Sequence, residues 1–182
     1  MTSIIASTAA SAAKAAHSSV ATLLATAQVK PGAKIPATTI KEDDPHEGFP
    51  LSLTGKNILI GVPGAFTPPC SSQVPGYISN YEKFKERGVK DIYVVAVNDA
   101  FVTKAWKQKL APDGTPVRFI ADDTGAFTGA LGLLFDANAL LGAPRAKRYV
   151  IVTEGDTVEH IALEEDPTQV TVTSADAVLV LL

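Results

Sequence analysis

Residues 57 to 70, NILIGVPGAFTPPC, carry the pattern on which the fold depends. The first six of them, NILIGV, form the short apolar run that is typical of a buried strand. A turn rich in Gly and Pro follows at 63–69, and a helix is expected from about Ser71 to Arg87. A second apolar run, DIYVVAV at 91–97, predicts a strand parallel to the first, so residues 57–97 are expected to form a β-α-β unit.

The sequence after this unit predicts a change from parallel to antiparallel strands. A polar helix is expected at 100–110, a short strand at 117–121 and a helix at 127–134. Gly155-Asp156 is a turn signal between the runs 148–154 and 158–164, which should form an antiparallel hairpin. Ser174 begins a last helix, with Asp176 in its first turn, where the helix dipole favours a negative charge. The chain is therefore predicted to be an α/β protein with one mixed sheet flanked by helices.

Residues 1–30 form a separate Ala- and Ser-rich segment that contains no Asp, Glu or Arg. This composition leaves three interpretations open: a helix packed on the domain, a mitochondrial presequence or a secretory signal. We favour the packed helix, and the apolar stretch at 20–24 is too short and too polar to span a bilayer. Residues 31–50, rich in Pro, Thr and charge, are expected to be an extended loop that leads into a single domain, 31–182.

The net charge and the cysteine content narrow the classes of function. The net charge is −3, and the basic residues are scattered apart from Arg145, Lys147 and Arg148, so the broad basic face that nucleic acid requires is absent. The only cysteine, Cys70, cannot form an internal disulfide, which favours a reducing compartment. We expect a cytoplasmic protein, with a mitochondrial location as the alternative, and neither nucleic acid nor a membrane as a partner.

The position of Cys70 indicates a reactive thiol rather than a buried apolar residue, which is the commoner role of a lone cysteine. Cys70 follows the first predicted strand and opens the first predicted helix. At a helix N-terminus, unpaired backbone N–H groups and the positive end of the dipole stabilise a thiolate, the nucleophilic form. The Thr67 hydroxyl lies in the same turn, and Arg148 begins a strand that is expected to lie beside it.

These residues resemble a known family. Pro63, Thr67 and Cys70 match the peroxiredoxin signature Pro-x3-Thr-x2-Cys, and PGAFTPPCSSQVPGY is similar to the peroxiredoxin-5 type (type II) subfamily in a fungal-like form. Further blocks resemble the subfamily in the same order, so the resemblance covers about residues 31 to 182. The blocks are VNDAF at 97–101 followed by Ala105-Trp106, ADDTGAF at 121–127, and KRY at 147–149.

The resemblance implies a thioredoxin-like fold and thiol-dependent reduction of hydrogen peroxide and alkyl hydroperoxides, in antioxidant defence and redox homeostasis. It implies no metal and no cofactor. Cys70 is then the peroxidatic residue, and the Thr67 hydroxyl, the Cys70 amide and the Arg148 guanidinium bind the peroxide oxygens. Pro63 shields the thiolate, and Leu140 and Leu141 contribute to an apolar collar around the substrate. Arg145 and Lys147 are expected to stay on the surface.

The chain departs from the subfamily pattern in three ways. Gln73 stands where members commonly carry His, and Pro69 has no N–H to offer a substrate. The chain also has no second cysteine, so an external thiol must resolve the Cys70 sulfenic acid. Glutathione, glutaredoxin and thioredoxin are the expected donors, with a Cys70–Cys70 disulfide between subunits as a lesser route. Members are often dimers, which makes a homodimer an expectation that no sequence pattern tests.

Two other classes of function stay open at this point. A thioredoxin-like sensor or binding module would use Cys70 for regulatory oxidation without turnover. A thiol transferase is the other, although such enzymes usually rely on Cys-x-x-Cys, and here Thr67 occupies the partner position. Catalytic consumption of peroxide distinguishes a peroxidase from both.

Overall fold

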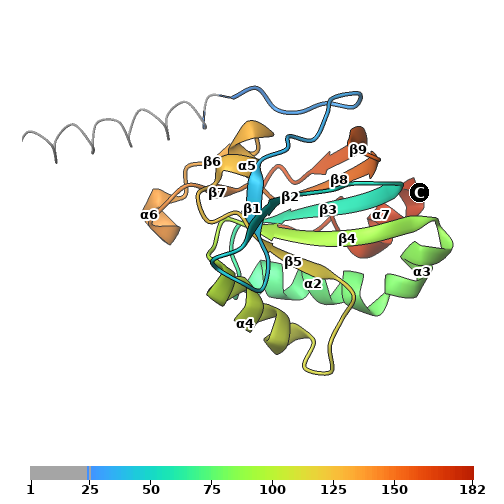
Figure 1. Ribbon diagram of the computed structural model, residues 1–182, viewed down its shortest axis with the longest axis horizontal. Helices are drawn as coiled ribbons and strands as arrows, with labels where there is room; N and C mark the ends of the chain where they lie inside the picture. The colour runs from blue at the N-terminus through green and yellow to red at the C-terminus, as the bar shows by residue number, and fades with distance from the viewer. Residues whose placement is uncertain (1–23, 25) are drawn as a thin grey trace, which may run out of the picture.

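A seven-stranded mixed sheet forms the centre of the molecule in the computed structural model, which describes residues 24 and 26–182. The strand order is β2-β1-β5-β4-β3-β8-β9, and β6 and β7 form a separate small ribbon (Figure 1). The strands are β1 (Thr39–Lys41), β2 (Gly48–Pro50), β3 (Lys56–Val62), β4 (Val89–Ala96), β5 (Arg118–Ala121), β6 (Leu134–Phe135), β7 (Arg145–Ala146), β8 (Tyr149–Glu154) and β9 (Thr157–Leu163).

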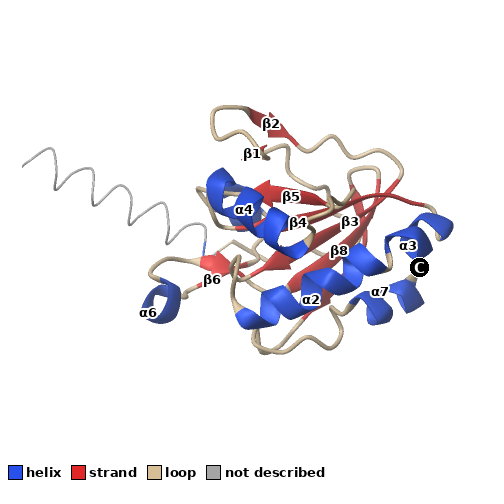
Figure 2. Ribbon diagram, turned by 90° about the horizontal axis from the view of Figure 1, so that it is seen from below, coloured by secondary structure: helices blue, strands red, loops and turns tan. Residues whose placement is uncertain are grey.

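Helices cover the sheet unequally on its two faces. Figure 2 shows α2 (Pro68–Ser79), α3 (Tyr81–Glu86), α4 (Ala100–Leu110) and α7 (Ala175–Leu181) in front of the strands, on one face. The short helix α5 (Ala126–Ala130) lies toward the other face, and α6 (Asn138–Leu141) projects from one end of the molecule (Figure 1). Within the part of the chain that the structure describes, no helix has the length and apolar character needed to cross a membrane.

Strand β3 shows why the sheet has two packed faces. Its side chains alternate, so Ile58 and Ile60 belong to the apolar core beneath α2, whereas Leu59 belongs to the core on the opposite face. All three are fully buried. An apolar run without polar alternation is what a central strand requires when both of its faces are covered.

The pairing of β3 places the candidate site. β3, β4 and β5 run parallel, so their carboxyl ends meet at one edge of the sheet, where open α/β sheets commonly bind ligands. β8 runs antiparallel to β3 with Gly61 opposite Tyr149. The residue before β8, Arg148, is thereby brought beside the end of β3, where the turn that leads to Cys70 begins.

The predicted mixed α/β architecture is confirmed, including the parallel pair at the centre and the antiparallel hairpin β8-β9. The helix expected at 71–87 starts earlier and is divided at Asn80, which leaves helical geometry and donates its side-chain amide to Gly76 O. The prediction of a helix at 127–134 was wrong beyond residue 130, because Gly132 has a φ of +67° and the chain turns into β6.

The prediction that residues 31–50 form only an extended loop was also wrong. This segment contains β1 and β2, which pair with each other and extend the sheet beyond β5. Pro50 lies in β2, an edge strand, where a residue without N–H is tolerated. The helix expected in the N-terminal segment falls on residues 1–23 and 25, which lie outside the described residues, so it stays a prediction.

Gly61 provides a test of this packing. A Cβ added at Gly61 would overlap the buried ring of Tyr149 on the adjacent strand, where neither backbone can move away easily. We expect Gly61→Ala to lower the free energy of unfolding by about 1 to 3 kcal/mol, measured by urea denaturation. The cost should shrink in a Tyr149→Leu background, because the ring is gone. An equal cost in both backgrounds would contradict the proposed overlap.

Candidate active site

Cys70 lies in the first turn of α2 and is fully buried. Thr67 is the N-cap, and Pro68 and Pro69 fill the first two helical positions, where a fixed φ suits the helix and a missing N–H breaks no helical bond. The Ser71 amide donates to Thr67 O, and among the described residues the Cys70 amide has no acceptor. The two prolines therefore leave the Cys70 N–H as the one unengaged donor in this turn.

The turn before α2 is held in a strained conformation. Thr67 N donates to Gly64 O at 3.3 Å, and this closure requires Phe66 to adopt a φ of +65°, which is uncommon for any residue other than Gly. Asn98, just after β4, accepts from Ala65 N at 3.1 Å and fixes the turn from outside. The Thr67 hydroxyl donates to Gly64 O at 3.0 Å. Its proton is thus engaged, and its oxygen remains able to accept a hydrogen bond from a peroxide O–H.

The Arg148 guanidinium lies against the sulfur of Cys70. Nη2 is 3.4 Å from Sγ and also donates to Pro167 O at 2.7 Å, and Nε donates to the same carbonyl at 2.9 Å. Nη1 donates to Gln73 Oε1 at 2.6 Å. Only 1% of Arg148 is exposed to solvent. The structure therefore brings together Cys70 and Arg148, which the sequence had proposed as partners across 78 residues.

The charge of Arg148 has no carboxylate partner among the described residues. Its two oxygen acceptors, Pro167 O and Gln73 Oε1, are both neutral. A buried charge is costly unless an opposite charge compensates it. Among the residues that the structure describes, Cys70 is the only ionisable side chain in hydrogen-bond contact with the guanidinium, which therefore lies where it can stabilise negative charge on the sulfur during a reaction.

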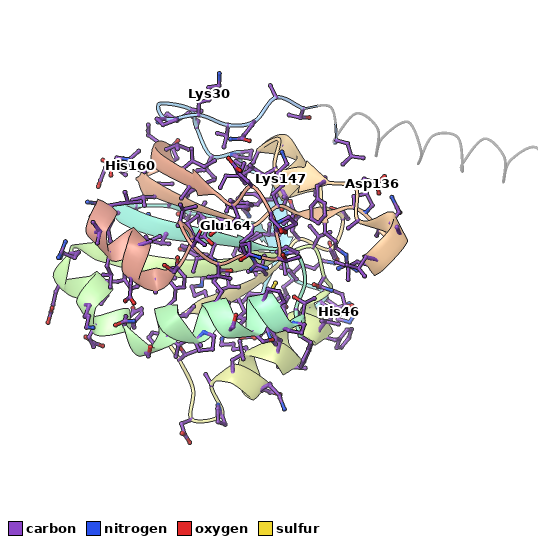
Figure 3. The ribbon with its side chains drawn as sticks, turned by 180° about the vertical axis from the view of Figure 1, so that it is seen from behind. Lys30, His46, Asp136, Lys147, His160 and Glu164 are labelled. Atoms are coloured by element: carbon purple, nitrogen blue, oxygen red, sulfur yellow. The ribbon has the colours of Figure 1, made fainter. Side chains whose placement is uncertain are left out.

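A second layer of hydrogen bonds fixes Gln73 and the segment between β9 and α7. Gln73 Nε2 donates to Thr173 O and to Thr173 Oγ1, at 2.9 and 3.0 Å. The Glu164 carboxylate accepts four hydrogen bonds, from the amides and the hydroxyls of Thr171 and Thr173. Figure 3 shows Glu164 inside the outline of the molecule, above α2, whereas His160 lies at the edge. Burial raises the pKa of Glu164, but the hydrogen bonds outweigh it, so the pKa lies below its ordinary value.

A largely apolar cavity of about 410 Å³ opens over this constellation. Arg148, Thr67, Thr168 and Asp136 contribute its polar lining, and the buried Pro63 also lines it. The apolar wall comes from Leu140 and Leu141 of α6 with other residues, among them Phe135, Ala137, Pro68, Pro69 and Pro167. Leu140 is 85% exposed. A side chain of this size is left open to solvent at the rim of the cavity, where a substrate would cover it.

The structure corrects the expectation that Arg145 is only a surface residue. Arg145 is half-buried, and its guanidinium donates to Val97 O at 2.5 Å and to Leu141 O at 3.1 Å. It thus ties α6, which carries the apolar wall, to the end of β4. The isolated basic cluster in the sequence was the only available signal for this role. Nothing in the sequence pointed to Pro167, Thr173 or Glu164, because their contacts join segments far apart in the chain.

Comparison with known proteins relates this arrangement to a family. The Redoxin family model matches residues 30–179. The chain is similar to the "Peroxisomal membrane associated protein 20" of Schizosaccharomyces pombe, with 50% identity over 149 residues that cover 81% of this chain and 96% of that protein. It is also 43% identical to Peroxiredoxin-2C of Oryza sativa subsp. japonica over 130 residues, which cover 71% of this chain and 79% of the relative.

Solved structures show the same fold. Reduced Prx3 of Vibrio vulnificus, in complex with hydrogen peroxide, superposes with a TM-score of 0.77 at 33% identity, covering 85% of this chain and all of that one. Peroxiredoxin 5 of Alvinella pompejana gives 0.76 at 35% identity, covering 84% and 96%. The 1-Cys peroxiredoxin of Plasmodium falciparum gives 0.74 at 26% identity, covering 82% and 96%. The thioredoxin-like fold expected from the sequence is confirmed.

Arg148→Lys tests whether the guanidinium geometry matters beyond its charge. An ammonium group carries its three donors on one atom and cannot reproduce the four contacts that the planar guanidinium makes to Cys70, Gln73 and Pro167, so the rate of reaction with peroxide should fall by about two orders of magnitude. Stopped-flow kinetics with hydrogen peroxide measure this rate. Arg118→Lys is the matched control, since Arg118 forms a bidentate ion pair with Glu42 at the other side of the sheet. A near-native rate for Arg148→Lys would remove Arg148 from the site.

Glu164→Gln tests the hydrogen bonds that Thr171 and Thr173 donate to the Glu164 carboxylate, through the pH dependence of the stability of the fold. A carboxyl group whose folded pKa is lowered stabilises the fold at pH values above its ordinary value of 4.5, and this stability is lost as the pH falls through the lower folded pKa. The variant should be less stable than the wild type by about 1 to 3 kcal/mol at pH 7. The difference should shrink as the pH falls below 4.5. Urea denaturation at pH 7 and at a series of pH values below 4.5 measures it, and a difference independent of pH would contradict the account.

Proposed function

The chain belongs to the redoxin family and, within it, to the peroxiredoxins, and on this basis we propose that it reduces hydrogen peroxide and alkyl hydroperoxides at Cys70 by a 1-Cys mechanism. The observation that carries the proposal is the contact between the buried, carboxylate-free guanidinium of Arg148 and the only thiol of the chain. The enzyme is a thiol-dependent peroxidase. Antioxidant defence and redox homeostasis are the roles that follow from this chemistry.

The first step is an in-line displacement at a peroxide oxygen. The Cys70 thiolate donates an electron pair to one oxygen, so that an S–O bond forms, the O–O bond breaks and a sulfenic acid results. Sulfur is oxidised by two electrons, and the leaving oxygen departs as hydroxide or alkoxide that takes up a proton to become water or an alcohol. We propose that the Cys70 amide and Arg148 stabilise this oxygen and that the Thr67 oxygen accepts a hydrogen bond from the peroxide O–H; their positions around the sulfur support these roles.

The cavity supports a substrate range that includes organic hydroperoxides. A space of about 410 Å³ exceeds what hydrogen peroxide needs, and its wall is built mainly of Leu, Pro, Phe and Ala side chains. Burial of an alkyl group against such a wall is favourable by roughly 25 cal/mol for each Å² of apolar surface removed from water. Pro63, Leu140 and Leu141 are the residues that we propose to contact the substrate.

Recovery of the thiol requires a reductant from outside the chain. An external thiol attacks the sulfenic sulfur, forming a mixed disulfide and releasing water, and a second thiol then releases Cys70 as a thiol. We propose glutathione, glutaredoxin or thioredoxin as the donor. Excess peroxide should carry Cys70 on to the sulfinic and sulfonic acids, because no second cysteine of the chain competes for the sulfenic acid.

A steady-state assay with each reductant tests this proposal. Hydrogen peroxide and an alkyl hydroperoxide are supplied with thioredoxin, with glutaredoxin plus glutathione, or with dithiothreitol, and peroxide consumption is followed. We expect many turnovers with at least one donor and none for Cys70→Ser. Mass spectrometry should find sulfinic and sulfonic acid at Cys70 after excess peroxide, and much less when the active donor is present.

The outcomes separate the classes of function. Consumption limited to one equivalent of peroxide per chain with every donor would favour a redox sensor over a peroxidase. Cys70 that remains unmodified at all peroxide concentrations would exclude both. Disulfide reduction without any response to peroxide would favour a thiol transferase.

The names of the relatives and the resemblance to the subfamily bear on the cellular location and the oligomeric state of the chain. The relatives have names that place them at a peroxisomal membrane, in chloroplasts or in mitochondria, so a cytoplasmic location is one of several candidates. Comparing fluorescent fusions with and without residues 1–30 would identify any targeting role of that segment. A homodimer is the assembly that we propose, and analytical ultracentrifugation would detect it.

A further inference from the structure

We propose that Gln73 is a positioning residue that sets the orientation of the Arg148 guanidinium and thereby the peroxide reactivity of Cys70. Gln73 lies one helical turn after Cys70 on α2, is 3% exposed, and touches both Arg148 and Thr173. Its side-chain hydrogen bonds go to Thr173 and Arg148 and not to the sulfur, so it acts through Arg148. This inference rests on the proposed peroxidase function, which it deepens by assigning a determinant of rate.

The hydrogen bonds of Gln73 allow only one orientation of its amide. Nε2 faces the Thr173 carbonyl, which only accepts, so the group on that side must be the donor. Oε1 faces Arg148 Nη1, which only donates, so the group on that side must be the acceptor. A flipped amide would oppose NH₂ to the guanidinium and oxygen to a carbonyl. Gln73 thus links a fixed carbonyl to the cation with both of its polar atoms in use.

The contacts of Arg148 show what this link adds. The Pro167 carbonyl accepts from Nε and Nη2, which fixes one edge of the planar guanidinium. Gln73 accepts from Nη1, on the other branch of the group. With both edges fixed, the plane cannot rotate about the Pro167 contact, and Nη2 stays directed at Cys70 Sγ. Without Gln73 the Nη1 group would be buried without an acceptor, which is costly, and the guanidinium would turn to find one.

Thr173, which binds the Gln73 amide, is itself fixed by hydrogen bonds to Glu164 and Tyr77. Its amide and hydroxyl both donate to the Glu164 carboxylate at 2.9 Å. Its carbonyl also accepts from the Tyr77 hydroxyl at 2.7 Å, and burial raises the pKa of Tyr77, which therefore remains a donor. Tyr77 donates to the same carbonyl as Gln73 but forms no hydrogen bond with Arg148. It offers a matched control that removes one buried hydrogen bond from the same network.

Gln73→Leu and Tyr77→Phe are compared by two reactions of the reduced protein. Hydrogen peroxide requires donors aimed at its oxygens, whereas iodoacetamide reacts with the thiolate by losing iodide and needs none. We expect Gln73→Leu to slow the peroxide reaction by between about tenfold and a hundredfold, as for the loss of a hydrogen bond to a charged group. Tyr77→Phe should remain within about threefold of the wild type. Fluorescence of Trp106, whose indole donates to Ser71 Oγ beside Cys70, reports whether the first turn of α2 stays in place.

Alkylation distinguishes positioning from loosening. If Gln73 only held the helix together, its loss would expose the buried thiol, and Gln73→Leu would alkylate faster than the wild type. Positioning predicts a rate of alkylation equal to or below that of the wild type, alongside the slower peroxide reaction. Faster alkylation with altered Trp106 fluorescence would overturn the proposal, as would equal peroxide rates in Gln73→Leu and Tyr77→Phe.

The reaction of the wild-type protein with peroxide distinguishes a failure of the Gln73 proposal from a failure of the proposed peroxidase function. A wild-type protein that does not react with peroxide would refute the peroxidase function itself. A wild-type protein that reacts, beside a Gln73→Leu variant that reacts equally fast, would refute only the role of Gln73.

Discussion

The buried guanidinium of Arg148 is the interaction on which the account of this molecule depends. Its two oxygen acceptors are neutral, and Cys70 is its one ionisable contact among the described residues. A buried cation without an opposite charge is unfavourable, so the guanidinium stabilises negative charge that develops on the adjacent sulfur. The same guanidinium lines the cavity, so one group connects the sulfur with the space that a substrate would occupy.

Three segments that are distant in the sequence meet at this contact. The turn after β3 and the first helical turn of α2 supply Thr67 and Cys70, the residue before β8 supplies Arg148, and the segment 164–173 supplies Pro167 and Thr173. The antiparallel register of β8 on β3 brings the first two together. Within the third segment, the Glu164 carboxylate accepts four hydrogen bonds from Thr171 and Thr173, which fixes the position of Thr173 beside Gln73.

The parts of this arrangement that could be predicted from the sequence have strong local signals. Apolar runs predicted β3 and β4, and the Gly- and Pro-rich turn at 63–69 predicted that Cys70 opens a helix. The remaining parts depend on tertiary contacts. Phe66 gives no hint that it adopts positive φ, and Arg145 resembles a surface residue until Val97 O and Leu141 O are seen beside it. Gln73 was recognised as a departure from the family pattern, but its link to Arg148 is visible only in three dimensions.

A single-turnover reaction tests the central claim most directly. Reduced protein is mixed with one equivalent of hydrogen peroxide, the sulfenic acid is trapped with dimedone, and mass spectrometry locates and counts the adduct over time. We expect one adduct per chain, at Cys70, formed at least about a thousandfold faster than on a free cysteine, because charge pairing and aligned donors act together on the peroxide. Adduct formation at the rate of a free thiol would contradict the account.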